Sequence, residues 1–462
     1  MAISIETALG EMGYKVADSE VMFSKIDEWK AMFQGDIKGF HKYQEWNGKR
    51  VVDKQRKSLG MPKKCCEDWA DNIYNDNVHI QIGNEFQDVL AKVLQLNKFR
   101  RKFSETLEYS FALGTGGLVE YKDRQKNARI NYYKAYCIRP LEVINNEIVS
   151  CAFASFKADK IVHLNVHDRQ IDGTYLIKNR VFEQKSDKSI VEVDSDLSKE
   201  ERSPVKLFQI IKPVITNNIE LDSGMGMSCF ANAEDENKVV DTIFDSFDNE
   251  IAIGKKRVYA KSGAVNINIT ADENGNNLAV PVFDHNQTIF YEVSGEDDEG
   301  TIIQETQEEL RIPSLTEALQ TALNLYGRKV GLGDDYYSFK DGTVYTNTTQ
   351  VISSNSAFYK TLKKHEKAVL EVIQELVTAI YYLTHNKISN FDVTVDFDDS
   401  IIEDTAEIKR QAMLEYNSGL IDSVQYYQDV YKMTEEQAIQ FDKSIRERLK
   451  ANLEEDTILG EE

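Results

Sequence analysis

The sequence predicts an α+β fold in which helices and an antiparallel sheet form one part, and two further helices carry a small β module. Three observations predict it. Apolar residues recur at helical spacing over residues 1 to about 130, and they alternate with period two from there to about residue 215. Beyond these regions the pattern reads helix, strand-rich segment, helix and then a much longer helix.

Composition limits the classes of function. With 462 residues, 41% of them hydrophobic, the chain can bury a large core, and its length suggests about three domains. It has 77 acidic and 55 basic residues, a net charge of -22. Proteins that bind nucleic acid tightly through its phosphates show the opposite balance. If DNA is involved, we expect it to be passed along rather than held.

The sequence shows no membrane or export signal. A run of about 18 apolar residues, as a membrane-spanning helix needs, does not occur. Residues Met1 to Thr7 lack the basic and apolar regions of a signal peptide, so we expect the chain to stay in the cytoplasm where it is made. The cysteines are odd in number and form no C-x-x-C pair, which predicts reduced thiols; they are Cys65, Cys66, Cys137, Cys151 and Cys229.

Two N-terminal segments predict helices. Apolar residues repeat at helical spacing over Val21–Phe33 and again over Phe86–Leu96. Between them, Trp46–Val52 and Arg56–Lys64 form a basic, turn-rich linker. We expect this linker to be a solvated surface. The functional alternative is a contact with an acidic partner or with a neighbouring copy of the chain.

Gly114–Gly117 has the composition of a phosphate-binding loop but not its context. Such loops follow a strand and open a helix. Here the glycines follow the helical Phe103–Leu113 and precede the strand-like Leu118–Tyr121. We therefore predict a helix C-cap and the entry to a hairpin.

The middle of the chain predicts an antiparallel sheet. Its runs alternate with period two and are rich in β-branched and aromatic residues; they are Arg129–Tyr133, Val149–Phe156, Lys160–His167 and Tyr175–Phe182. His163 and His167 are four residues apart, but no third ligand is near in sequence, so we predict no metal site.

Phe230–Gly254 predicts a helix with two stripes. The apolar stripe is Val240, Phe244, Phe247 and Ile251, and the acidic stripe beside it is Glu234, Asp241, Asp245 and Asp248. The next segment, Lys255–Ile312, predicts a β module between two helices. Within it Val265–Ile269 alternates, Asp272–Asn277 signals a turn, and Glu296–Gly300 is an acidic loop.

Two helices and the loop between them are the element around which the chain is organised. A capping box, Ser314 with Glu317, predicts that the first helix begins after Pro313 and ends at Gly331. The second begins in the cluster Ser353–Ser356 and runs to Thr384, a length of roughly 45–50 Å. The loop Gly331–Gln350 between them is too long and polar to be a simple connection, which indicates a function.

The C-terminal region predicts a strand and then helices. Phe391–Phe397 alternates with period two, and residues Asp404 to about Leu453 are helical with Gly419 as a break. The acidic end after Leu453 is expected to be frayed.

An ordered set of motifs resembles the portal proteins of tailed bacteriophages, in the Gp6-like branch of phages that infect Gram-positive bacteria. The motifs are spread from about residue 45 to 385: Ser58–Asp71, Phe111–Gly116, Leu207–Pro213, Gln350–Ser356 and Lys363–Glu366. One departure concerns Asn347-Thr-Thr-Gln-Val, where relatives commonly have Thr-Ala-Thr-Glu-Val. Any role that needs a carboxylate at Gln350 is therefore not expected here.

The resemblance implies a portal-protein fold with a wing, stem helices, a β-containing clip, a long bridging helix and a helical crown, assembled as a ring of usually twelve subunits. Mapped onto this chain, the parts are the wing at 1–229 (helical, then antiparallel β), stem helices at 230–254 and 313–331, the clip at 255–312, a tunnel loop at 332–350, the long helix at 351–386, a wing strand at 387–402 and the crown at 403–462.

The same resemblance implies a structural function and no enzymatic activity or cofactor. The ring would stand at one capsid vertex in the virion, after assembly in the host cytoplasm, as the channel for packaging and ejection of double-stranded DNA. Its partners would be other copies of the chain, the major capsid protein and scaffold, the terminase large subunit and a head-completion adaptor. DNA would be bound without sequence specificity, and no membrane is expected.

Three sets of site residues follow from this mapping. Acidic stem residues would line a negative channel that repels phosphate: Glu234, Asp241, Asp245 and Asp248. The tunnel loop would face DNA through Gly333, Asp334, Asp335, Lys340, Asp341, Thr346 and Asn347. Glu296, Asp297 and Asp298 of the clip would contact partner proteins.

Two other classes stay open. Asp334 and Asp335 could hold Mg²⁺ in a metal-dependent enzyme, although adjacent carboxylates in a loop are more often solvated turn residues. The chain could also be another ring component of the head–tail connection or a scaffold.

Overall fold

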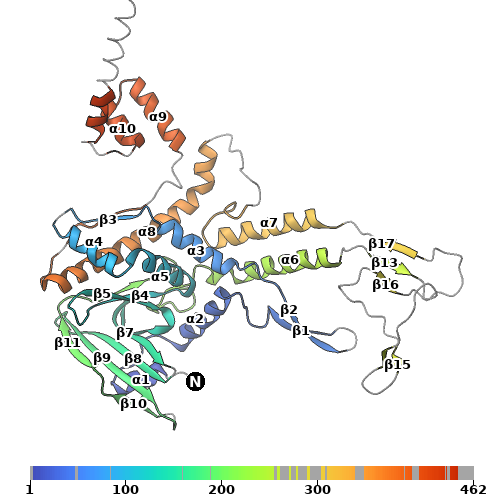
Figure 1. Ribbon diagram of the computed structural model, residues 1–462, viewed down its shortest axis with the longest axis horizontal. Coiled ribbons are helices and arrows are strands. Elements are labelled where there is room, and N and C mark those ends of the chain that lie inside the picture. The colour runs from blue at the N-terminus through green and yellow to red at the C-terminus, as the bar shows by residue number, and fades with distance from the viewer. Residues whose placement is uncertain are drawn as a thin grey trace, which may run out of the picture.

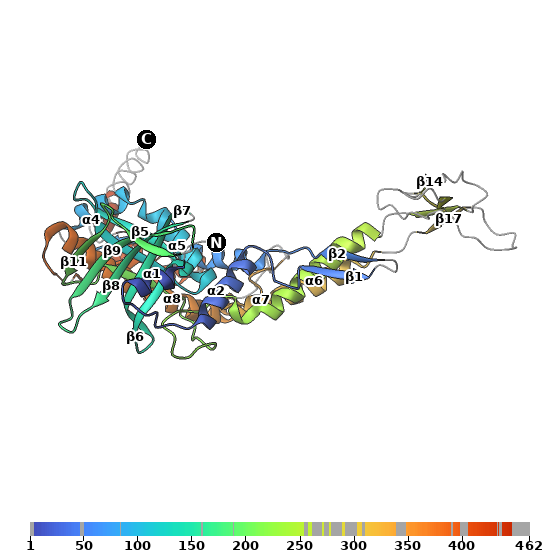
Figure 2. The same ribbon diagram turned by 90° about the horizontal axis from the view of Figure 1, so that it is seen from below.

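The computed structural model consists of a mixed body and a pair of helices that extends from it (Figures 1 and 2). It describes residues 4–46, 50–83, 85–158, 160–187, 189–253, 257–260, 270–271, 277–278, 289–291, 303–306, 310–338, 348–389, 391–397, 405–431, 433 and 437–445.

The N-terminal region is helical, as predicted. Helix α3 begins after Gly60, which has a φ of 73°, and carries a proline in its first turn, where the missing N–H costs nothing. The helices are α1 (Ile5–Glu11), α2 (Glu20–Phe33), α3 (Met61–Ile73), α4 (Gln87–Leu96) and α5 (Phe99–Leu113).

The predicted linker between α2 and α3 is instead a β-hairpin. Strands β1 (Lys42–Trp46) and β2 (Val51–Gln55) pair antiparallel, with Lys42 opposite Gln55 and Trp46 opposite Val51. The signal was present in the sequence, because Asn-Gly between two short runs is a strong hairpin signal. The basic residues and turn formers of this segment are equally typical of a linker, so they do not distinguish a linker from a hairpin.

Glycine at position 114 ends α5 as predicted. Gly114 is the C-cap with a φ of 78°, and strand β4 (Gly116–Lys122) begins two residues later. A Cβ on Gly114 would lie 2.3 Å from the Gly226 carbonyl oxygen, so this position also needs glycine for a close approach of two backbones.

Three of the four predicted strands share one antiparallel sheet, which is larger than expected, whereas the predicted strand Arg129–Tyr133 lies in a separate sheet. Strand order is β10-β9-β8-β7-β6 with β11 also on β9, and β12-β4-β5 forms a separate antiparallel sheet. The strands are β4 (Gly116–Lys122), β5 (Ala128–Lys134), β6 (Ile138–Ile144), β7 (Glu147–Ala158), β8 (Ile161–Arg169), β9 (Tyr175–Gln184), β10 (Ile190–Val193), β11 (Lys199–Ser203) and β12 (Phe208–Ile211), with short 3-10 turns η1 (Ala135–Cys137) and η2 (Ala231–Ala233).

Both faces of the larger sheet are buried. Along β7, Cys151 and Phe153 face the main core, whereas Ala152 and Ala154 face a second core with α1. This is the period-two alternation expected of a strand. The main core joins the sheet to the N-terminal helices α2 to α5 and to the long helix near the C-terminal end.

Glu120 is an unusual buried group in β4. Its residue is 1% exposed, and neither carboxyl oxygen has a hydrogen-bond partner in the described part of the chain. Burial raises the pKa of this carboxyl from 4.5 to about 8, so the folded protein holds it protonated at neutral pH.

Because the folded state holds Glu120 protonated, the free energy of unfolding should depend on pH. The folded state binds this proton more tightly than the unfolded state, so the stabilisation is complete below pH 4.5 and is lost as the pH rises through about 8. Glu120→Gln should therefore leave the urea midpoint at pH 4 nearly unchanged and raise the free energy of unfolding at pH 8 by roughly 3–4 kcal/mol. Glu201→Gln, at an exposed position in β11, is the control and should show no such difference between the two pH values.

The next elements are two long antiparallel helices. Helices α6 (Glu234–Ile253) and α7 (Ile312–Lys329) lie side by side in both views and point away from the body (Figures 1 and 2). Arg311 pairs with Glu250 at 2.7 Å at the far end, and Lys329 pairs with Glu236 at 3.6 Å at the near end. These pairs link the two helices at both ends.

The predicted start of α7 was wrong. The helix begins at Ile312, Arg311 is the N-cap, and no side chain caps the first turn. Pro313 lies inside that turn rather than before it. Proline is favoured there because its fixed φ suits a helix and its missing N–H would be unpaired anyway, and this preference prevailed over the predicted capping box.

A small β module lies beyond the far end of the pair (Figure 2). Strand β13 (Arg257–Ala260) pairs parallel with β16 (Ile289–Tyr291) and antiparallel with β17 (Ile303–Thr306). Strands β14 (Thr270–Ala271) and β15 (Asn277–Leu278) pair antiparallel on either side of the predicted turn. The predicted strand Val265–Ile269 and the loop with Glu296, Asp297 and Asp298 lie outside the described residues.

The long helix is longer than predicted. Helix α8 (Thr348–His385) has 38 residues, about 57 Å at 1.5 Å per residue. The cluster Ser353–Ser356 lies inside it, because a preference for capping positions does not exclude such residues from a helix interior. It ends at His385, before Asn386 with a left-handed φ of 54°.

The C-terminal elements agree with the prediction in kind. Strand β18 (Thr394–Asp396) pairs antiparallel with β3 (His79–Gln81) of the N-terminal region. Helices α9 (Thr405–Asn417) and α10 (Ser423–Tyr431) are separated at Gly419, whose φ is 73°. In the described residues no helix is long and apolar enough to cross a membrane.

Candidate functional site

The loop after α7 begins with a tight turn built on glycine. The backbone N–H groups of Leu332 and Gly333 both donate to the Gly327 carbonyl, at 2.9 and 3.2 Å. Gly331 and Gly333 have φ values of 86° and 99°, which favour glycine. A Cβ on Gly327 would lie 2.5 Å from the Gly333 carbonyl oxygen. The turn therefore requires glycine on the helix as well as in the loop.

Gly327→Ala should release this turn. The added methyl group cannot coexist with the present position of the Gly333 carbonyl. We therefore expect the free energy of unfolding to fall by about 1–3 kcal/mol and proteolysis after residue 331 to become faster. Limited proteolysis with mass spectrometry measures it. Ala318→Ser, on the same helix at a half-buried position, should leave the cleavage pattern unchanged.

Two tyrosines then fix the first part of the loop to α3. The Tyr337 hydroxyl donates to Asp68 Oδ2 at 2.9 Å, and Asn72 Nδ2 donates to the Tyr336 hydroxyl at 3.0 Å. Burial raises the pKa of the Tyr337 hydroxyl far above its usual range, so it stays a donor. The Tyr336 ring also lies 5.9 Å from Phe358 in α8. The start of the loop is thus held between α3 and the long helix.

Asp334 and Asp335 are exposed at this turn. Arg328 Nε donates to Asp334 Oδ1 at 2.6 Å, and its guanidinium holds the pKa of that carboxyl below its usual range. Asn324 Nδ2 donates to Asp335 Oδ1 at 3.3 Å. Both carboxylates are therefore hydrogen-bonded to α7. In the described part of the chain, no group of three His, Cys, Asp or Glu residues is arranged to hold a metal ion.

The other predicted loop residues cannot be placed. Lys340, Asp341, Thr346 and Asn347 lie outside the described residues. Their contact with DNA stays a prediction.

The predicted channel-lining role of Asp241 is wrong. Its side chain is fully buried, and it accepts hydrogen bonds from the Leu59 backbone N–H at 2.7 Å, the Ser58 hydroxyl at 3.1 Å and His41 Nε2 at 2.9 Å. A carboxylate enclosed in this way cannot face a channel. It joins α6 to the segment between the hairpin and α3.

The neighbouring members of the acidic stripe are half-buried and also have partners in the same chain. Asp248 pairs with Lys57 Nζ at 2.7 Å, and Asp245 accepts a hydrogen bond from the Lys57 backbone N–H at 3.0 Å. Glu234 pairs with Lys238 at 2.8 Å within α6. Their exposure to a channel stays a prediction.

Sequence reasoning missed the partners of this stripe. The sequence predicts a surface linker at Lys57, Ser58 and Leu59, and no motif singles out His41. No pattern within α6 identifies these partners, because they lie about 180 residues earlier in the sequence.

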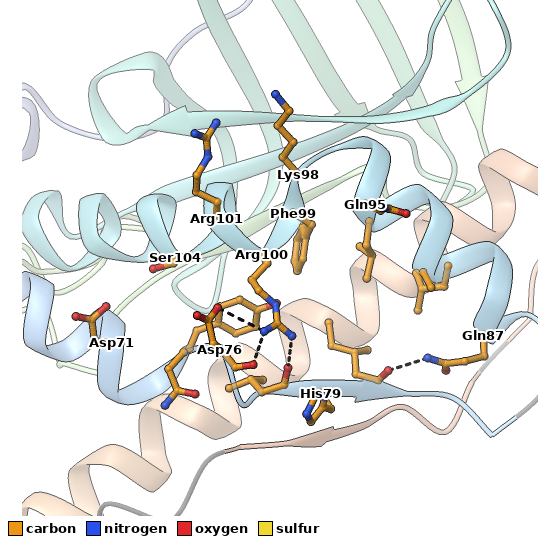
Figure 3. Close-up of a pocket in the computed structure, with 17 residues that line it drawn as sticks. Asp71, Asp76, His79, Gln87, Gln95, Lys98, Phe99, Arg100, Arg101 and Ser104 are labelled. Atoms are coloured by element: carbon orange, nitrogen blue, oxygen red, sulfur yellow. Dashed lines mark hydrogen bonds and ion pairs between the residues drawn. The ribbon is translucent and has the colours of Figure 1, made fainter.

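A separate groove of about 760 Å³ lies on the body among α3, β3, α4 and α5 (Figure 3). Its walls are held by Arg100, which donates to the Val78 carbonyl at 3.2 Å, and by Gln87, which donates to the Ile80 carbonyl at 3.0 Å. Among the residues that the structure describes, none of the predicted site residues lines it.

An antiparallel helix pair carries a β module away from a mixed body. Of the predicted acidic site residues, Asp241, Asp245, Asp334 and Asp335 hydrogen-bond to neighbouring elements of the same chain, and Glu234 pairs within its own helix. The chain belongs to the phage portal protein family of the SPP1 Gp6-like type, whose family model matches residues 13–450. A structural portal role follows from that membership.

Two solved structures are similar to this chain in fold. One is the neck of a native gene transfer agent (GTA) particle computed with C12 symmetry, with 11% identity, 80% of this chain and 89% of that chain covered, and a TM-score of 0.39. The other is the virion of a native GTA particle, with 10% identity, 79% and 87% covered, and a TM-score of 0.37. A search of curated proteins finds no match.

Proposed function

We propose that this chain forms a closed ring of identical copies at a capsid vertex. The ring would serve as the channel through which DNA is packaged and ejected, and as the platform on which terminase and head-completion proteins dock. The observation that carries the proposal is the family match over residues 13–450. The projecting α6–α7 pair with its β module supports it, because a narrow element of this kind buries more of its surface when copies stand side by side around an axis.

The charge of the chain fits a channel for DNA. Helix α6 has seven acidic residues and one basic residue, and the whole chain carries -22. A negative wall repels phosphate, so DNA can slide without being held. In this proposal Glu234, Asp245 and Asp248 contribute to the wall, whereas Asp241 acts on folding alone.

The loop after α7 would face the DNA. Its start is fixed by the glycine turn and by Tyr336 and Tyr337, which leaves Asp334 and Asp335 exposed. An enzyme that uses these carboxylates on Mg²⁺ is disfavoured, because Arg328 already supplies the positive charge beside Asp334. The clip carboxylates Glu296, Asp297 and Asp298 remain the proposed contacts for docking proteins.

Negative-stain images of the purified chain test the proposal. We expect rings with a central hole wide enough for a DNA duplex, about 20 Å across. Native mass spectrometry of the same sample should give a single multiple of the 52.8 kDa chain. Single copies at all concentrations, or closed particles without a hole, would contradict the ring.

A further inference from the structure

The β1–β2 hairpin is poorly covered by its own chain. In each strand four of the five residues are exposed, and the two strands form a separate two-stranded sheet. Such a sheet is marginal in water unless a third strand or another surface packs against it. Its outer edges are also open to pairing with another chain, a condition that natural proteins usually avoid.

The end of the hairpin exposes an apolar pair. Trp46 and Val51 lie directly opposite each other and are 63% and 56% exposed. Trp46 differs in this from the other two tryptophans, because Trp29 and Trp69 are 3% and 0% exposed. Exposed aromatic residues of this kind are enriched at the centres of protein interfaces.

The hairpin is held at its base to the acidic stripe of α6. Lys57, just after β2, pairs with Asp248, and the Leu59 N–H donates to Asp241. The hairpin then extends in the same general direction as α6, toward the far end of the helix pair, and diverges from the helix (Figure 1). Its free faces therefore lie at the side of the helix pair, where a neighbouring copy would stand in a ring.

Charge complementarity selects the partner. The described residues from Lys42 to Lys57 include five basic and two acidic side chains, whereas the α6–α7 pair carries seven acidic side chains besides the buried Asp241 and three basic ones. The α6–α7 pair also exposes isolated apolar residues: Val239, Ile251 and Leu325 are 49%, 48% and 52% exposed. A second copy of this chain thus presents an acidic, partly apolar helix surface that matches a basic hairpin with an apolar end.

We propose that the β1–β2 hairpin of each copy packs on the α6–α7 pair of the next copy, with Trp46 and Val51 buried in the contact. This inference rests on the ring proposed above. In this proposal, residues 42–55 form the contact between the projecting α6–α7 parts of neighbouring subunits.

Acrylamide quenching of tryptophan fluorescence tests the contact in the unmodified protein. In separate copies Trp46 is the accessible tryptophan of the three, so one fraction of the emission should be quenched readily. In purified rings that accessible fraction should disappear. Rings that form while Trp46 stays as accessible as in separate copies would overturn the inference and leave the proposed function intact. Protection that appears only after another virion protein is added would overturn it too, whereas the absence of any ring would overturn both.

A double variant measures the size of the effect. Trp46→Ala with Val51→Ser should raise the chain concentration needed for half-assembly by about tenfold or more, because central aromatic residues dominate interfaces. The thermal melting of separate copies should not change, since both side chains are exposed there. Ile171→Ala is the control. This residue is fully exposed in the connection between β8 and β9, so its substitution should leave assembly unchanged. Normal assembly of the double variant would contradict the proposal.

Discussion

Trp69→Ala is expected to lower the free energy of unfolding by about 3–5 kcal/mol, the cost of a large cavity at a fully buried site. The Trp69 ring lies 5.9 Å from Phe111 in α5, 5.7 Å from Phe358 and 4.9 Å from His365 in α8. Its Nε1–H donates to the Val330 carbonyl at 3.1 Å, at the end of α7. One side chain on α3 therefore joins three other helices.

Urea unfolding of separate copies measures this loss. Trp46→Ala is the matched control, because it removes the same side chain from a position that is 63% exposed, and it should change the free energy by no more than about 0.5 kcal/mol. Trp69→Phe should lie between them, at about 1–2 kcal/mol, since it keeps most of the packing but leaves the Val330 carbonyl without its donor. Equal effects at positions 46 and 69 would mean that Trp69 is not at the centre of the core.

Asp241→Ala is expected to lower the free energy of unfolding by about 3 kcal/mol. The substitution leaves four buried or half-buried donors, on His41, Ser58, Leu59 and Asn237, without this acceptor. It should also free the base of the β1–β2 hairpin from α6. The loss can be measured as a shift in the urea midpoint, with proteolysis near residue 57 reporting the release of the hairpin.

Asp248→Ala separates a folding role from a channel role. This carboxylate belongs to the same stripe, but its side chain and that of Lys57 are 49% and 55% exposed, so its removal should cost less than about 1 kcal/mol. If Asp241→Ala were as harmless as Asp248→Ala, the buried hydrogen bonds of Asp241 would contribute little to stability. The conclusion that Asp241 acts in folding rather than in a channel would then be wrong.

The order of elements could be predicted because each has a strong local signal. Period-two alternation placed β5, β7, β8 and β9, and the apolar stripe Val240, Phe244 and Phe247 placed α6. The Gly114 C-cap was predictable because a glycine between helix and strand patterns has one common explanation.

The burial of Asp241 could not be predicted, because it depends on contacts across about 180 residues of sequence. Helical periodicity shows on which face of the helix a side chain lies, but not which residues pack against that face. The same holds for Cys65 and Cys229, whose sulfur atoms are 3.3 Å apart in the core although the sequence separates them by 164 positions. Boundaries failed for a different reason: at α7 and α8, capping residues and proline gave competing local signals.

A reconstruction of the assembled ring by electron cryomicroscopy tests the central claim most directly, through the distance of the α7–α8 loop from the symmetry axis. The account predicts that Gly331 to Ser338, with Asp334 and Asp335 exposed, lie on the inner wall close to the axis. A ring in which these residues lie on the outer perimeter, with another element lining the hole, would contradict it.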